Sequence, residues 1–108
     1  MSTIRIAVAS TPLTATLEEA VPAAVVAVEE AGRLGARIVC LPETGLPGHR
    51  DQPRPVPDVS AGALENALRE VAAAARRAGV ATIVGVERPT RAGREIVSVV
   101  FGADGSRL

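Results

Sequence analysis

The chain has 108 residues, of which 47% are hydrophobic, so it is long enough for one small domain and too short for two. Twelve basic residues, all arginine, balance twelve acidic residues without any run of like charge, so neither nucleic acid nor a membrane surface is an expected partner. The apolar runs are too short to span a membrane, and the first residues lack the layout of a signal peptide. We therefore expect a cytoplasmic protein.

The first third of the chain predicts a strand, a helix and a second strand. Residues 4–9 are a β-branched run that ends at a Ser-Thr-Pro breaker. Thr16 and Glu19 have the spacing of a capping box, and apolar residues then recur at helical intervals. Pro22 would remove one helical hydrogen bond, so we expect a kink there or a later start. The continuous apolar run at 38–41 predicts the second strand.

A long loop and a second helix follow. Residues 44–60 are rich in proline and glycine, and loops of this length are usually functional or disordered. Ser60 can cap a helix with one apolar face, which ends before Gly79. Residues 80–86 then predict the third strand.

The last segment predicts a hairpin. We expect a turn over residues 89–93 and a fourth strand over 96–101. Asp104-Gly105 is a strong turn signal that calls for a further strand. The fold class is therefore α/β, in the order β-α-β-loop-α-β-β.

Glu43 is the leading candidate for chemistry. It follows Pro42 at the carboxyl end of the second predicted strand, where α/β sheets gather their ligand-binding groups, although a solvated carboxylate could also occupy such a position. Cys40, the only cysteine, lies three residues earlier. Side chains alternate along a strand, so Cys40 and Glu43 should face opposite sides if the strand continues that far. We interpret Cys40 as a core residue.

Other polar residues have simpler interpretations. His49 and Arg50 in the long loop could line a substrate entrance or seat the loop, but we expect neither to be catalytic. Arg88, Arg91 and Arg94 predict an exposed rim around the turn that follows the third strand. We propose no metal site and expect no cofactor.

Two stretches carry a family resemblance. The first reads IVCLPE at 38–43 and continues as TGLPG at 44–48, which is similar to the segment around the catalytic glutamate of the nitrilase superfamily of carbon-nitrogen hydrolases. The second reads IVGVE at 83–87 and resembles the family's glycine-bearing strand. One departure is the pair at 96–97, Ile-Val, where the family often has Tyr-Asn.

The resemblance implies a partial nitrilase-like α-β-β-α sandwich and a Cys-Glu-Lys mechanism with Glu43 as general base. It implies a small-molecule amide or nitrile substrate and a homo-oligomer in the full-length form. Residues 1–108 would be the N-terminal part of a single domain, truncated after the Asp104-Gly105 turn. Because no lysine and no nucleophilic cysteine are present, we expect this chain alone to be inactive.

Two other functions remain open. The first is a non-catalytic α/β binding module, such as a pseudoenzyme fragment, that binds a partner through an open sheet edge. A nucleotide-binding domain ranks last, because neither a dinucleotide-binding glycine motif nor a phosphate-binding loop is present. Half of a sandwich should leave one apolar sheet face uncovered and prone to association.

Overall fold

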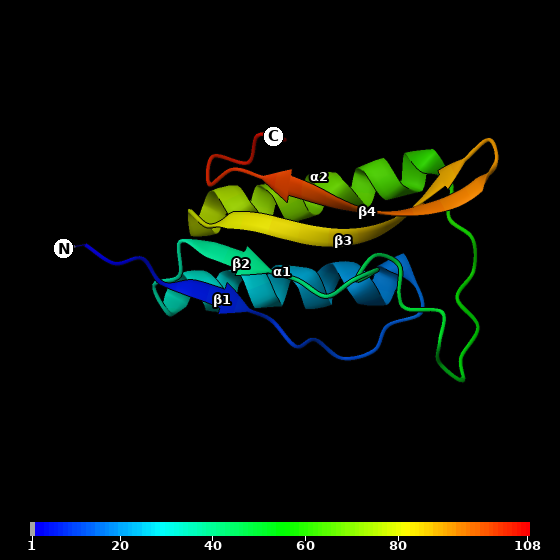
Figure 1. The fold of residues 1–108 in the computed structure, drawn as a ribbon, viewed down its shortest axis with the longest axis horizontal. Coiled ribbons are helices and arrows are strands. Elements are labelled where there is room, and N and C mark those ends of the chain that lie inside the picture. Colours follow the sequence, from blue (N-terminus) through cyan, green and yellow to red (C-terminus); the bar gives the residue numbers. More distant parts are fainter. Residues whose placement is uncertain (1) are drawn as a thin grey trace.

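A computed structural model describes residues 2–108 and shows a four-stranded sheet with two helices packed on one face (Figure 1). The strands lie side by side in sequence order, with β1, β2 and β3 parallel and β4 antiparallel to β3. They are β1 (Ile6–Val8), β2 (Ile38–Cys40), β3 (Ala81–Thr90) and β4 (Gly93–Phe101). The α/β class and the predicted order of elements are confirmed.

Helix α1 (Leu17–Arg33) begins where the cap predicts. The side chain of Thr16 accepts a hydrogen bond from the backbone N–H of Glu19 at 3.3 Å. Pro22 lies inside the helix with its ring exposed, so the expectation of a later start is wrong. Apolar residues on the opposite face, including Val28, are buried, and this packing offsets the lost hydrogen bond, which costs about 3 kcal/mol in a helix interior.

Helix α2 (Ala61–Ala78) has caps of the expected kind at both ends. Ser60 Oγ accepts a hydrogen bond from the N–H of Ala63 at 3.1 Å, and Gly79 ends the helix with a φ of 66°. The two helices pack closely: a β-carbon on Gly32 would lie 3.0 Å from the β-carbon of Ala78. No helix within residues 2–108 is both long and apolar enough to cross a membrane.

The β3–β4 hairpin is longer than predicted. Its turn contains only residues 91–92, and Pro89, expected in the turn, lies in β3 opposite Arg94. Proline is tolerated there because β2 does not reach this part of β3, so the strand pairs on one side only. The predicted turn at Asp104-Gly105 is confirmed, and the chain then returns beside β4 with the N–H of Leu108 bonded to the carbonyl of Val100.

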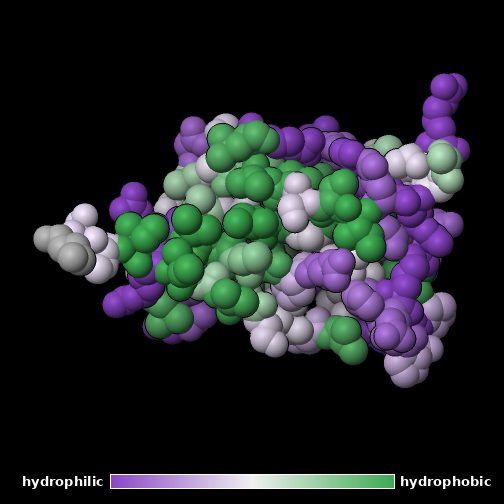
Figure 2. Space-filling model, viewed as in Figure 1, coloured by the Kyte–Doolittle hydropathy of each residue, from purple (hydrophilic) through white to green (hydrophobic). Residues whose placement is uncertain are grey.

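The second face of the sheet carries no covering layer within residues 2–108. Strand register aligns Val8, Cys40, Ile83 and Val100 in one row across it. Val8 is 84% exposed, and apolar side chains form a broad patch over this face (Figure 2). The prediction of an uncovered apolar face is confirmed. The assignment of Cys40 to the core is wrong, because β2 buries Val39 against the helices and turns Cys40 outward.

Candidate functional site

The segment that carries Glu43 is a bulge between two points of pairing with β3. Cys40 pairs with Ile83, and Leu46 pairs with Val86. Between these two points the segment from Cys40 to Leu46 advances six residues, whereas β3 advances only three. The three extra residues are accommodated by a turn within residues 42–45. Pairing on both sides of the turn fixes where it leaves the sheet and where it returns.

Gly85 forms the surface on which this turn rests. A β-carbon on Gly85 would lie 2.4 Å from the carbonyl oxygen of Pro42 and 2.8 Å from the Cα of Glu43. Side chains alternate along β3, so a β-carbon on Gly85 would point to the same uncovered face of the sheet as the side chain of Ile83. The turn with Glu43 therefore lies on the uncovered face of the sheet, at the carboxyl ends of β2 and β1.

Cys40 and the Glu43 turn consequently share a face, contrary to the expectation that they lie on opposite sides. The alternation of side chains along a strand does not apply to Glu43, because β2 ends at Cys40 and the turn begins two residues later. The side chain of Glu43 is exposed and makes no hydrogen bond to any residue in 2–108. Such a carboxylate can accept a proton from a group placed against it.

Thr44 is held in an unusual backbone conformation. Its φ is 47°, which is rare for a β-branched residue, and such strain concentrates at functional sites. Its side chain is buried, and its Oγ1 has no hydrogen-bond partner among the described residues. Three residues after Thr44, the loop is anchored at Pro47, whose carbonyl accepts a hydrogen bond from Oγ1 of Thr14 at 3.1 Å.

Arg50 seats the long loop, which is one of the two roles considered for it, through an ion pair with Glu87 that was not predicted. Nε of Arg50 lies 2.8 Å from Oε2 of Glu87, and Nη2 lies 2.6 Å from Oε1. Glu87 is only 8% exposed, and its hydrogen bonds raise the pKa of Arg50. The two residues are 37 positions apart, and only the return of the loop at Leu46 reveals that they meet.

The remaining candidates are peripheral. His49 is exposed, as expected, and its Nδ1 accepts a hydrogen bond from the N–H of Asp51 at 3.2 Å. Arg88, Arg91 and Arg94 are exposed around the hairpin, as predicted. Within the described part of the chain, no three His, Cys, Asp or Glu side chains are grouped to hold a metal ion.

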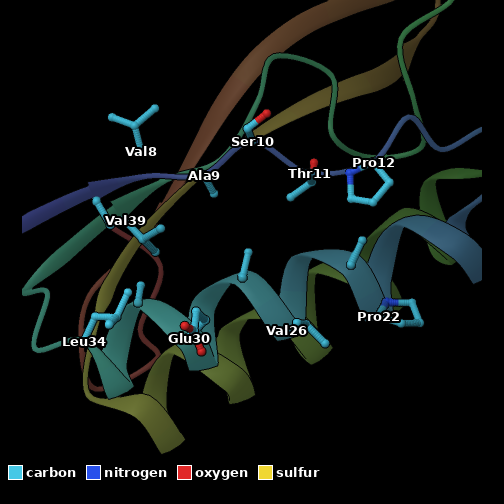
Figure 3. A pocket seen from close by; sticks show the side chains of 14 residues that line it. Val8, Ala9, Ser10, Thr11, Pro12, Pro22, Val26, Glu30, Leu34 and Val39 are labelled. Carbon is cyan, nitrogen blue, oxygen red and sulfur yellow. The ribbon is translucent and has the colours of Figure 1, made fainter.

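A separate groove of about 520 Å³ lies between the edge strand β1 and helix α1 (Figure 3). Its walls are mostly apolar and include Val8, Val26 and Leu34. Among the described residues that line the groove, only Glu30 is ionisable, and its carboxylate is paired with Arg33. Neither Cys40 nor Glu43 lines the groove, so it is distinct from the site described above.

Residues 5–106 match the sequence profile of the family described as carbon-nitrogen hydrolase. No curated protein shows a significant match to the chain.

Solved structures of similar fold include an amidase from Nesterenkonia sp., which is 23% identical, with 99% of this chain aligned to 41% of that one at a TM-score of 0.79. A cysteine-to-alanine variant of the amidase from Nesterenkonia sp. AN1 in complex with butyramide aligns at a TM-score of 0.78 and 22% identity, over 99% of this chain and 41% of that one. A glutamate-to-glutamine variant of that amidase, in which acrylamide has added to the active-site cysteine, is 22% identical with a TM-score of 0.79, over 98% of this chain and 42% of that one. The chain thus has a nitrilase-like fold and spans about two-fifths of the length of these proteins.

Proposed function

The chain belongs to the carbon-nitrogen hydrolase family, and from this premise we propose that Glu43 is the general base in hydrolysis of a non-peptide carbon–nitrogen bond. The observation that carries the proposal is the position of Glu43 on an exposed bulge, seated on Gly85 at the carboxyl ends of parallel strands. Its carboxylate is free of hydrogen bonds within residues 2–108 and therefore available to a reacting group.

In the proposed reaction, a cysteine sulfur bonds to the amide or nitrile carbon while Glu43 takes the thiol proton. For an amide, Glu43 returns that proton to the nitrogen as the carbon–nitrogen bond breaks and the amine departs. Water then attacks the thioester while Glu43 accepts a proton from the water. The carbon–sulfur bond breaks, the carboxylic acid leaves, and the released thiolate takes the proton from Glu43. A lysine ammonium stabilises the oxyanion that forms at each attack.

Both partner groups would come from outside residues 1–108, which contain no lysine and only the thiol of Cys40. We infer that these residues are the N-terminal part of one catalytic domain. The uncovered apolar face supports this, because a second sheet packed there would bury the exposed row that contains Val8 and place new side chains beside Glu43.

The proposed substrate is a small-molecule amide or nitrile. The amide class is supported by the similar solved structures, which are amidases, one of them in complex with butyramide. We further propose that the complete protein assembles as a homo-oligomer.

The test is an assay of ammonia release by the product of the complete reading frame that contains these residues, referred to below as the complete product. Short aliphatic amides and nitriles serve as substrates, and the 108-residue chain is assayed in parallel. We expect hydrolysis by the complete product and none by the 108-residue chain. Hydrolysis by the 108-residue chain would contradict the requirement for outside lysine and cysteine. No hydrolysis by either would favour a binding module whose apolar sheet face holds a partner.

A further inference from the structure

The orientation of Glu43 depends on its backbone, because its side chain has no hydrogen bond to residues 2–108. We propose that Arg50 is a positioning residue for Glu43. By binding the buried carboxylate of Glu87, Arg50 fixes residues 46–50, where the loop rejoins the sheet, onto β3. This inference rests on the proposed role of Glu43 and adds a residue to that site.

Arg50 uses all three nitrogens of its guanidinium. Nε and Nη2 engage the two oxygens of Glu87, as described above. Nη1 donates to the carbonyl of Val56 at 2.6 Å, and Nη2 also reaches Oδ1 of Asp58 at 2.9 Å. The side chain of Arg50 thus connects its own part of the long loop to the later residues of that loop and to β3.

The link reaches Glu43 through a short stretch of backbone. Leu46 donates its N–H to the carbonyl of Gly85 at 3.2 Å and accepts from the N–H of Glu87 at 2.9 Å. Gly85 supports the Glu43 turn, and Glu87 lies two residues farther along the same strand, about 7 Å away. The segment from Glu43 to Arg50 is therefore held against β3 at both of its ends.

Burial distinguishes this pair from the other ion pairs of the hairpin. The side chains of Arg88 and Glu95 are 52% and 44% exposed, and pairs of this kind contribute little to stability. The side chain of Glu87 is 10% exposed, so loss of its partner would leave a buried charge uncompensated. Arg94 does not replace Arg50 as the partner of Glu87. Its Nε lies 3.9 Å from Oε1 of Glu87, and its Nη1 donates a hydrogen bond to Asp58.

The geometry requires arginine rather than a positive charge alone. A lysine ammonium is a compact point donor and cannot span two carboxylate oxygens, the carbonyl of Val56 and Asp58 in one plane. Arg50→Lys therefore keeps a positive charge beside Glu87, so the buried carboxylate stays compensated. It removes the set of guanidinium hydrogen bonds that fixes the loop.

The experiment compares Arg50→Lys with the wild-type complete product and uses Arg88→Lys as the matched control for an exposed pair. We expect Arg50→Lys to lower kcat by roughly 10- to 100-fold, with KM changed by no more than about twofold. Backbone hydrogen exchange at Leu46 and Glu87 should become at least about tenfold faster, with α2 unchanged as an internal fold control. Arg88→Lys should leave both readouts near wild type.

The inference is overturned if Arg50→Lys leaves kcat or the exchange at Leu46 and Glu87 at wild-type values. Failure of the proposed function has a different signature, namely a wild-type protein that hydrolyses neither amides nor nitriles. In that case the exchange measurement still decides whether Arg50 holds the loop on β3.

Discussion

The Cα of Glu43 lies so close over Gly85 that a β-carbon on the glycine would come within 2.8 Å of it. The two residues are 42 positions apart and meet because the chain leaves β2 in a bulge and rejoins β3 at Leu46. A glycine in β3 would otherwise weaken the strand, so its value here is the space that it gives to the turn. The proposed base and this glycine therefore form one structural unit.

Gly85→Ala should displace the turn and destabilise the complete product by about 1–3 kcal/mol, because its β-carbon would meet backbone atoms that cannot move independently. The measurement is the urea midpoint together with ammonia release, and we expect both to fall. Gly62→Ala is the control: the added carbon would meet nothing within 4 Å outside its own stretch of helix, and in the exposed first turn of α2 it should not lower the urea midpoint. Equal effects of the two substitutions would contradict the account of the turn.

Leu46→Ala should also destabilise the complete product. Leu46 is fully buried and marks the point at which the bulge returns to β3, so removing its side chain leaves a cavity beneath the loop. We expect a loss of about 2–5 kcal/mol in the free energy of unfolding. Leu13→Ala, at a position that is 64% exposed, should change it by less than about 0.5 kcal/mol. A Leu46 effect as small as that of Leu13 would show that the bulge is not anchored there.

Glu19 gives a pH-dependent prediction. The hydrogen bond from Arg54 at 2.8 Å, followed by that from the N–H of Ala15, lowers the pKa of its carboxyl below the ordinary value of 4.5. A carboxyl whose pKa is depressed by folding stabilises the fold above its unfolded pKa, and this contribution is lost as the pH falls through the folded pKa.

Glu19→Gln should therefore lower the urea midpoint of the complete product at pH 6–7, and the difference from wild type should shrink as the pH falls below 4.5. Glu18→Gln is the control, because the side chain of Glu18 makes no hydrogen bond within the described residues. A difference that grows toward acid would contradict the direction of the shift.

The open face predicts self-association of the 108-residue chain. Ile6 and Val8 expose 63% and 84% of their surface on neighbouring positions of that face, and large exposed apolar surfaces drive contact between copies. By light scattering, we expect oligomers that decrease in Val8→Lys. Leu13→Lys, which adds the same charge outside the strands, should have little effect. A monodisperse monomer would contradict the prediction.

The elements themselves were predictable because their signals are local. The caps at Thr16 and Ser60, the alternation in the strands and the glycine after α2 each act within a few residues. The position of Glu43 at a strand end was predicted in the same way.

What could not be predicted depends on pairing between distant segments. The exposure of Cys40 follows from which face of β2 the helices cover, and the length of β3 follows from its register with β4. The Arg50–Glu87 pair depends on the return of the loop at Leu46. No pattern in the neighbouring sequence carries this information.

The central claim is tested most directly by the rate of ammonia release from a short aliphatic amide by Glu43→Gln in the complete product. Glutamine keeps the size of the side chain but cannot accept and return a proton. We expect kcat to fall by about 10²- to 10⁴-fold. The fold of residues 2–108 should be retained, because the side chain of Glu43 is exposed in this part of the chain. A Glu43→Gln protein that releases ammonia at the wild-type rate would show that Glu43 is not the base.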